Sequence, residues 1–498
     1  MPNARAVVGW LRRDGWLGAV SLGLSLLLLL LFVAFRDLPM VDLPQHAAQI
    51  ATWQRWDARL PEVTERFELN FRTPYLLAYP LARLLAPLTG TVLALKLVVW
   101  LALTLSLVTL ERLARKLGHD PWLCLFGLVT SMGMCFYFGF VSFLLAMPLA
   151  VGSLVVALEH GRQPRLATGC ALALLQGLLL GAHGVAFVMG FGVVGLVLLR
   201  GGGSVLGRLA PLLLPVLMAV VWIAPGPVSE RVGGDAWDLS LARLADFPAL
   251  LTSMGSRDHL SIGLGVLVLA VTAFTLGRRL TRLPEHWLPL ALLLAGYACF
   301  PVMFRGIVLL HTRLPCFLLP LWLLAVPAGA ATIRAVRARR VAILGVTLAW
   351  LGLFTHRLAA FQGEAASFHE LTAALPPGLA MRPLIFERES RVFPGVPAYL
   401  HYSAYYYVEK GGSQGYSFAQ YALSVVRYRQ LSQATMRGGA EWRPDLFEPS
   451  ETPSYDAFLV RDTESAHAEL FDEGTVALRA HVGPWWAYSR LDDATAQR

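Results

Sequence analysis

Residues 15–35 read GWLGAVSLGLSLLLLLLFVAF and form the first long apolar run of the chain, from Gly15 to Phe35. About 20 apolar residues are enough for a helix to cross the hydrocarbon core of a membrane. No small-residue cleavage site follows the run, so it predicts a retained transmembrane helix and not a signal peptide. The chain has 498 residues, of which 56% are hydrophobic, and this composition excludes an ordinary soluble protein.

Further apolar segments predict ten more spanning helices, at residues 91–111, 121–136, 140–158, 166–182, 184–199, 205–224, 260–277, 286–304, 308–328 and 341–355. Eleven spans place the two termini on opposite sides of the membrane. Under this count the basic clusters all fall on one side: Arg12/Arg13, Arg112/Arg115/Lys116, Arg162/Arg165, Arg200/Arg208, Arg278/Arg279/Arg282 and Arg334/Arg337/Arg339/Arg340. Because basic loops stay in the cytoplasm, we expect a cytoplasmic N-terminus and an outer C-terminal region.

The segment from Thr73 to Leu88 is apolar enough to span but carries Pro74, Pro80, Arg83 and Pro87. Counting it as a span would move Arg112 and its neighbours to the outside. We therefore expect a re-entrant or juxtamembrane helix, covered by protein or lining a water-filled cavity.

The polar chemistry of the chain excludes several protein classes. The net charge of +9 comes mostly from arginines in short clusters without interleaved aromatic residues, which indicates topology more than nucleic-acid binding. The cysteines lie inside apolar segments and form no disulfide framework or zinc-binding spacing: Cys124, Cys135, Cys170, Cys299 and Cys316. The motifs of soluble hydrolases and P-loop ATPases are absent from the sequence.

The predicted fold is an all-α polytopic membrane protein with about 11 transmembrane helices and a small α/β extracytoplasmic C-terminal domain. Residues 1–357 form the transmembrane domain, including a first outer loop with juxtamembrane helices at 36–90, and residues 358–498 form the outer domain. The outer domain has predicted strands at 383–386, 455–460, 476–481 and 485–489, and predicted helices at 364–374 and 418–436.

The first outer loop contains the stretch DLPQH, from Asp42 to His46. Asp42 can cap a helix running to about Trp56, with Pro44 in its first turn. Ile50, Trp53 and Trp56 suit a helix that lies at the membrane interface. The i, i+4 spacing puts Asp42 and His46 on one face. The carboxylate could act as a general base, and the histidine could bind phosphate or help hold a metal. An N-cap aspartate with a solvated histidine is the alternative.

Arg305, His311 and Arg313 flank another outer junction between apolar spans. Paired guanidinium donors could hold an anionic phosphate there, whereas snorkelling to lipid headgroups is the alternative. His183 lies between two apolar runs and also suits a helix-end cap.

Two further outer features have open interpretations. Arg257, Asp258 and His259 could add charge to a vestibule that Arg305, His311, Arg313 and His183 would also line. Alternatively, they could form an ion pair and a helix cap. The aromatic segment from His401 to Tyr407 could form a sugar-stacking or acceptor-binding surface. A tyrosine-rich strand packed on its neighbours is the alternative.

The chain resembles the GT-C superfamily of integral membrane glycosyltransferases. The resemblance rests on the cytoplasmic N-terminus, on Asp37 and DLPQH (42–46) in the first outer loop, and on the many spans and the outer C-terminal domain. It also includes the segments NFRTPY (70–75) and GFVSFLLAMP (139–148).

This resemblance implies transfer of a sugar from a polyprenyl-phosphate donor to a glycan, lipid or protein acceptor at the outer face of the membrane. The absence of cysteine from the outer domain favours a bacterial inner membrane. The resemblance further implies Asp42 as the base or metal-associated group, with Asp37 second, and Arg313 and Arg305 as ligands of the donor phosphate. A divalent metal, if one is used, would bind Asp42 and His46.

Two other functions stay open. Asp37 and Asp42 are separated by four residues and depart from the Asp-x-Asp form common in the family, which favours a non-catalytic scaffold or assembly subunit. A lipid or solute transporter would also use interrupted helices, although such proteins are built from repeated halves, and this chain shows no such halves.

Overall fold

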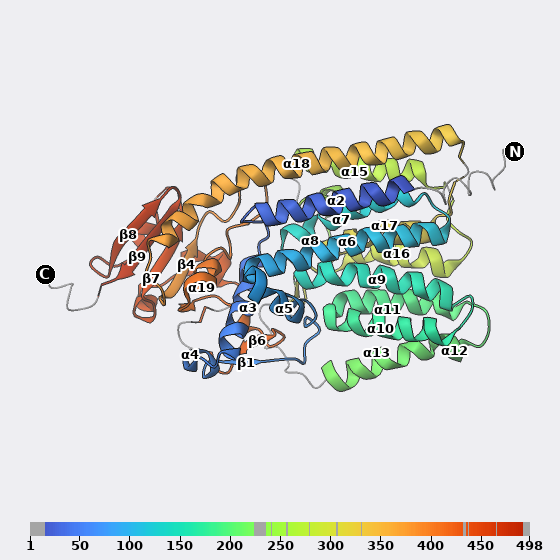
Figure 1. The fold of residues 1–498 in the computed structure, drawn as a ribbon. Coiled ribbons are helices and arrows are strands. Elements are labelled where there is room, and N and C mark those ends of the chain that lie inside the picture. The colour runs from blue at the N-terminus through green and yellow to red at the C-terminus, as the bar shows by residue number, and fades with distance from the viewer. Residues whose placement is uncertain are drawn as a thin grey trace.

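The computed structural model describes residues 15–223, 236–240, 242–254, 257–277, 279–304, 307–329, 331–431, 435–436, 438–464 and 466–491. In these residues a bundle of roughly aligned helices meets a β-sheet domain at one end (Figure 1). Helix α2 begins at the opposite end of the bundle, and the last strands lie in the sheet domain.

Helices occupy each of the eleven segments predicted to span. They are α2 (Gly15–Ala34), α6 (Thr91–Leu117), α7 (Cys124–Ser131), α8 (Met134–Tyr137), α9 (Val141–His160), α10 (Leu166–Ala182), α11 (Gly184–Leu199), α12 (Val205–Leu209), α13 (Leu213–Met218), α15 (His259–Thr275), α16 (Pro284–Cys299), α17 (Leu318–Ala325) and α18 (Ile333–Ala373). Five of the helical segments in the described part of the chain are long and apolar enough to cross a membrane: Gly15–Ala34, Thr91–Leu117, Val141–His160, Val205–Trp222 and Ile333–Ala373. The protein is therefore an integral membrane protein with a mostly helical fold.

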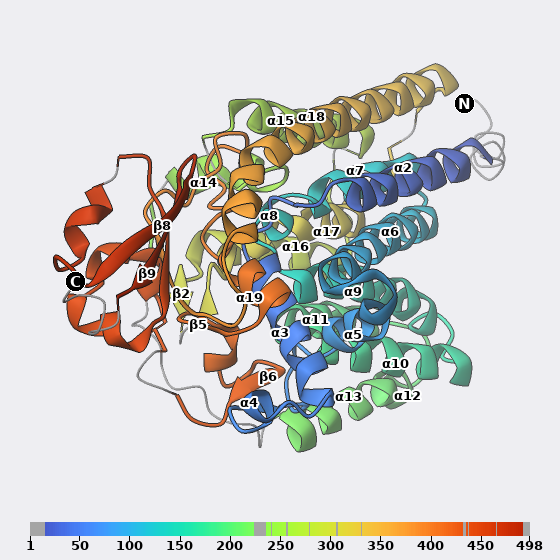
Figure 2. The same cartoon turned by 60° about the vertical axis from the view of Figure 1, so that its left-hand side comes forward.

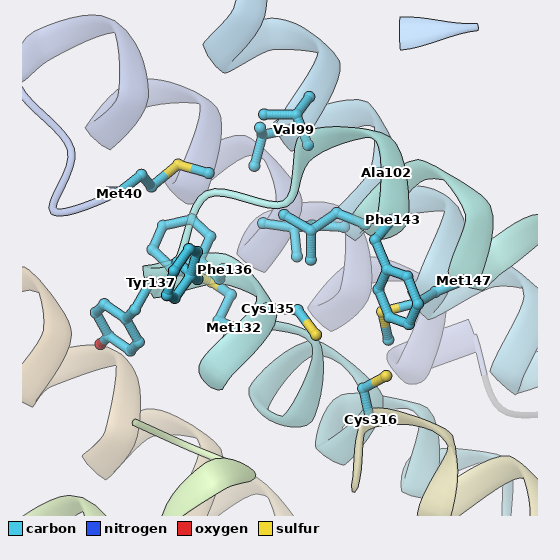
Figure 3. Packing of buried hydrophobic residues seen from close by; sticks show 14 of the residues in the cluster. Met40, Val99, Ala102, Met132, Cys135, Phe136, Tyr137, Phe143, Met147 and Cys316 are labelled. Carbon is cyan, nitrogen blue, oxygen red and sulfur yellow. The ribbon is translucent and has the colours of Figure 1, made fainter. Parts of the chain in front are cut away.

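The outer surface of the bundle is strongly apolar. Leu30, Leu206 and Val221 are between 64% and 76% exposed, an arrangement that lipid stabilises and water does not. The interior is built around α9, which packs against α6, α10 and α11. Figure 3 shows Phe136 and Tyr137 of α8 beside Met40 in this core.

Ion pairs connect the basic clusters at the end of the bundle remote from the sheet. Lys116 binds Glu159 at 2.8 Å, Arg340 binds Asp120 at 2.9 Å, and Arg200 lies 3.7 Å from Glu285. The clusters that contain Lys116, Arg200 and Arg340 therefore share one end of the bundle, whereas Arg12, Arg13 and Arg278 lie outside the described residues.

Helix α18 has 41 residues and is about 60 Å long at 1.5 Å per residue, twice the thickness of a hydrocarbon core. It packs against α7 and α15 in the bundle and continues to β8 and β9 of the sheet domain (Figures 1 and 2). The predicted span at 341–355 and the predicted helix at 364–374 are thus one continuous helix.

The elements predicted to lie outside the membrane surround the sheet-proximal end of the bundle, and the names outer loop and outer domain refer to this predicted side. From the first outer loop come α3 (Leu43–Asp57), α4 (Pro61–Thr64), β1 (Phe67–Leu69) and α5 (Ala78–Thr89), and from the later outer regions come α14 (Ala242–Leu250), β2 (Met303–Phe304) and β3 (Ile307–Val308). Helix α5 is about 18 Å long and too short to span, as expected for a juxtamembrane helix.

Helix α3 follows the predicted bounds, and nine of its first ten residues are buried. Ile50 lies in the core, and Trp53 packs on Phe71 with ring centroids 5.5 Å apart. The outer domain packs on α3. The position of this helix at the membrane interface stays a prediction.

The outer domain holds a five-stranded sheet in the order β5-β4-β7-β9-β8. Its strands are β4 (Ala380–Ile385), β5 (Ser413–Gln414), β7 (Ala457–Arg461), β8 (Val476–Val482) and β9 (Trp485–Arg490). Strand β4 runs parallel to β5 and β7, whereas β9 runs antiparallel to β7 and β8. The four predicted strands are thus confirmed.

Two expectations for this domain are wrong. The segment predicted as a helix at 418–436 forms a short 3₁₀ turn η6 (Phe418–Gln420) and strand β6 (Val426–Tyr428), which pairs with β1. The tyrosines expected in a strand lie in and before helix α19 (Ala404–Lys410), which packs on α3. In both places contacts with the first outer loop override the preference of the local sequence, for a helix at 418–436 and for a strand at the tyrosines.

Candidate functional site

The backbone of Asp42 is fixed by the turn that follows α8. Its N–H donates to the Phe138 carbonyl at 3.0 Å, and the N–H of Val41 donates to the Tyr137 carbonyl at 2.9 Å. Gly139 adopts φ +86°, and a Cβ at this position would meet the Asp42 nitrogen at 2.7 Å. Only glycine allows this close approach, so the chain places Asp42 through contacts with a segment almost 100 residues away.

The side chain of Asp42 does not cap α3, contrary to expectation. The residue is 7% exposed, and Oδ1 lies 3.4 Å from Nε2 of His401 in the outer domain. Burial raises the pKa of the Asp42 carboxyl well above its ordinary value, and the nearby positive charge of Arg313 opposes that rise. The carboxylate is therefore free of local helix hydrogen bonds and faces a mixed polar environment.

Arg313 provides the cation of the site from the 3₁₀ turn η4 (His311–Arg313). Its guanidinium lies over the Phe140 ring at 4.0 Å, and Nη1 is 3.1 Å from Nε2 of His183. His183 caps α11, with its ring edge-on to Tyr75 and Phe143 at 4.9 Å each. The structure thus brings Asp42, Arg313 and His183 together, and His183 is both a helix cap and a partner of Arg313.

His46 lies on the same helix as Asp42, one turn later. Its Nδ1 is 2.7 Å from the Tyr79 hydroxyl, and its ring meets Phe418 edge-on. Burial lowers the pKa of His46 to about 4, so this imidazole is neutral at physiological pH.

A divalent cation does not fit the donor set of this site. The Tyr79 hydroxyl engages His46 Nδ1, and the described residues contain no group of three or more His, Cys, Asp or Glu side chains placed to hold a metal. We therefore derive no step through a metal.

The outer domain also supplies side chains to the site. No sequence motif indicated these side chains individually. The ring of His401 stacks on Tyr416, with centroids 4.8 Å apart and planes 5° apart. Glu441, in the turn η7 (Ala440–Trp442), is buried, and its charge acts on Asp42. Burial raises the pKa of Glu441. For His401 the sequence signal was the aromatic segment that begins at this residue. For Glu441 no neighbouring residue in the sequence indicated that it lies near Asp42.

Asp37 has different partners. Its carboxylate oxygens are 2.9 and 3.1 Å from Nε2 of His369, and its backbone exchanges hydrogen bonds with the Gln362 side chain. Both partners belong to α18. Asp37 therefore ties the exit of α2 to α18.

The other vestibule residues connect elements. Asp258 caps α15 and forms a buried ion pair with Arg357 of α18, with a 2.9 Å contact between Oδ1 and Nη2. Arg257 binds Glu389 at 2.8 Å, and His259 is exposed. The suggested helix cap and ion pair are both present, but the partner of Asp258 is distant in sequence.

His311 and Arg305 are the two other residues predicted to bind the donor phosphate, and their outcomes differ. His311 faces Tyr297, with ring centroids 5.9 Å apart, and burial together with Arg243 lowers its pKa to about 4. Arg305 lies outside the described residues.

No protein-family model matches the chain, and no curated protein matches it in sequence. The fold is similar to that of ArnT from Cupriavidus metallidurans, whose crystal structure contains bound undecaprenyl phosphate. The TM-score is 0.52 at 12% sequence identity, and the match covers 97% of this chain and 99% of the ArnT chain. The likeness therefore shows a fold shared with ArnT over nearly the whole chain.

Proposed function

We propose that this protein transfers a sugar from a polyprenyl-phosphate donor to an acceptor at the outer face of the membrane. The observation that carries the proposal is that the Asp42 carboxyl and the Arg313 guanidinium are both buried at the sheet-proximal end of the bundle, close enough for their charges to interact. A fold shared with a protein that binds undecaprenyl phosphate supports the same class of donor.

Arg313 is suited to hold the donor phosphate. A guanidinium is planar and always charged, and it can give two parallel N–H bonds to phosphate oxygens. In a buried setting such charge-assisted bonds stabilise the leaving phosphate where negative charge accumulates. The ring of Phe140 below the guanidinium and the imidazole of His183 beside it fix its plane.

Asp42 is suited to accept the proton of the acceptor. As the acceptor hydroxyl attacks the anomeric carbon, its O–H bond breaks and the proton passes to the Asp42 carboxylate. The new C–O bond forms while the bond between the anomeric carbon and the phosphate oxygen breaks, and the lipid phosphate leaves beside Arg313. Burial makes the carboxylate a stronger base than an exposed aspartate.

The segment around Tyr416 and Phe418 covers this site, and its backbone is bonded to α3. The Tyr416 carbonyl accepts from Gln45 Nε2 at 3.2 Å, and the Phe418 N–H donates to Gln45 Oε1 at 3.2 Å. A covered site excludes water and so protects the activated sugar from hydrolysis. Substrate entry then requires this segment to move.

The test uses purified protein in lipid nanodiscs, a panel of polyprenyl-phosphate sugars and chromatographic detection of donor consumption. We expect wild type to consume a donor and Asp42→Asn to lose at least about 100-fold in rate, because the isosteric amide cannot accept the proton. Asp462→Asn is the matched control, since Asp462 is a buried aspartate paired with His467 elsewhere in the outer domain.

The alternatives give different results. A wild-type protein that binds polyprenyl phosphate and consumes no donor from the panel is a scaffold. Movement of an unmodified substrate across vesicles containing the protein identifies a transporter.

A further inference from the structure

His401 is the outer-domain residue that faces Asp42. Both side chains are buried, with 4% and 7% of their surfaces exposed, and His401 Nε2 lies 3.4 Å from Asp42 Oδ1. The contact joins the first outer loop to a segment that directly precedes α19. Asp42 therefore belongs to the membrane domain, and His401 belongs to the outer domain.

The orientation of the His401 ring is fixed by its neighbours. It lies flat against Tyr416 and edge-on to Phe418, with centroids 4.8 and 5.8 Å away. Gln45 of α3 binds the backbone of both aromatic residues. The direction of Nε2 towards Asp42 thus depends on docking of the outer domain onto α3.

The protonation state of His401 follows from its surroundings. Burial, together with the neighbouring His46, lowers the pKa of His401 to about 3, so the ring is neutral at physiological pH. A neutral imidazole carries one N–H, and a carboxylate beside Nε2 favours the proton on that nitrogen. The Nε2–H group therefore faces Asp42 Oδ1 across the 3.4 Å contact.

The second ring nitrogen of His401, Nδ1, is buried and has no hydrogen-bond partner in the described part of the chain. The same holds for Nδ1 of His369, whose Nε2 pairs with Asp37. His467 has both nitrogens paired, with Nδ1 3.0 Å from Asp462 and Nε2 2.9 Å from the Tyr488 hydroxyl. What distinguishes His401 is therefore its carboxylate partner, Asp42, which comes from the other domain and lies in the candidate site.

We propose that His401 is a positioning residue, through which the outer domain orients the Asp42 carboxylate to receive the proton of the acceptor. This inference rests on the proposed function and adds to it a residue from the second domain. His401 keeps its own proton throughout, and the acceptor proton passes to Asp42. The charged and titratable groups around this pair are Arg313 of η4, Glu441 of η7, His46 of α3, Tyr79 of α5, and Tyr416 and Tyr421 of the covering segment.

Two substitutions separate orientation from packing. His401→Phe keeps an aromatic ring to stack on Tyr416 but removes the N–H donor. His401→Gln removes the ring but keeps an amide N–H at a similar reach. If His401 orients Asp42, we expect kcat to fall about 10- to 100-fold in His401→Phe, the range for loss of a hydrogen bond to a charged group. His401→Gln should stay within about fivefold of wild type, and the KM for the donor should change little in either variant.

The pH profile provides a second measurement. A hydrogen bond to a carboxylate favours its ionised form, so loss of the N–H raises the pKa of Asp42. In a plot of kcat against pH, the fall of the rate at low pH (the acid limb) should therefore move to higher pH in His401→Phe. In His401→Gln it should remain in place. The matched control is His467→Phe, which removes a buried histidine of the same domain and should leave the acid limb unchanged.

The outcomes distinguish the inference from the proposed function. A His401→Phe enzyme that is more active than His401→Gln, with an unmoved acid limb, overturns the positioning role while the function stands. A wild-type protein that transfers sugar from no donor overturns both. If His401→Phe fails to fold, His401→Leu and His401→Asn give the same comparison of a variant without and a variant with an amide donor.

Discussion

At the scale of single residues, the site depends on charged groups that are buried. Asp42 stands at the N-terminus of α3 and yet its carboxylate makes no capping bond. Arg313 is 7% exposed and is held by an aromatic ring and a neutral imidazole. Burying such groups is unfavourable for stability, so their retention points to a role in binding and chemistry.

The role of Arg313 predicts a loss of lipid phosphate affinity. Replacing Arg313 with Gln removes a charge-assisted interaction of about 1.5–3 kcal/mol, so the Kd for polyprenyl phosphate should rise about 10- to 100-fold. Binding can be measured by native mass spectrometry in detergent. Arg208→Gln is the control, because Arg208 is a buried arginine that binds the carbonyls of Leu198 and Gly202 at the end of the bundle where the basic clusters lie. Equal affinities in the two variants would contradict the assignment.

The role of Asp42 predicts the pH dependence of transfer. The base must be ionised, so the rate falls as pH decreases through a pKa that burial has raised above the ordinary aspartate value. His46 and His401 have pKa values of about 4 and 3, so they stay neutral between pH 5 and 8 and add no limb there. Arg313→Gln removes the charge that lowers the Asp42 pKa and should move the acid limb upward. A limb that shifts downward in this variant would exclude Asp42 as the titrating group.

At the scale of elements, the site is placed by turns that other segments hold. The turn after α8 fixes Asp42, and η4 presents Arg313 from the junction between α16 and α17. In the segment 70–75, Asn70 Nδ2 donates to the carbonyls of Ala422 and Ser424 at 3.1 and 3.2 Å. These bonds attach the covering segment to the first outer loop.

The turn at Gly139 gives an element-level prediction. Gly139→Ala introduces a Cβ at positive φ, 2.7 Å from the Asp42 nitrogen, so the turn must shift. We expect a loss of stability of about 1–3 kcal/mol and a fall in kcat as Asp42 is displaced. Thermal unfolding and donor turnover measure the two effects.

The control for this substitution is Gly192→Ala in α11. A Cβ at Gly192 meets nothing within 4 Å, and alanine favours a helix over glycine. This variant should be at least as stable as wild type and fully active. A Gly139→Ala protein that behaves in the same way would show that the turn does not place Asp42.

At the scale of the whole molecule, α18 joins the membrane bundle to the outer domain without a break. Its contacts with Asp37 and Asp258 connect it to α2 and α15 at the outer end of the bundle. The outer domain is attached through α18, through the pairing of β1 with β6 and through the packing of α19 on α3. The contact of His401 with Asp42 belongs to this set of attachments.

The proposed sidedness is testable with single cysteines in a variant whose native cysteines are replaced by alanine. Glu473 and Gly202 are both exposed and lie in the outer domain and in the loop after α11, respectively. We expect Glu473→Cys to react with a membrane-impermeant maleimide on intact cells, and Gly202→Cys to react only after permeabilisation. The reverse pattern would place the site on the cytoplasmic side and contradict the proposed reaction at the outer face.

The sequence alone located the apolar helices and four of the strands, β4, β7, β8 and β9. Long apolar runs, arginine clusters and short β-type runs are local signals, and lipid and water act on each segment directly. The same signals located Asp42, His183 and Arg313 near one end of the bundle.

Only the tertiary structure decided which of these residues meet. It paired Asp37 with His369 and Asp258 with Arg357, joined two predicted helices into α18, and replaced the helix predicted at 418–436 by a strand on β1. It also brought His401 and Glu441 to Asp42. The physical reason is that these contacts connect segments 99 or more residues apart, and a local pattern of residues carries no information about which distant surface will cover it.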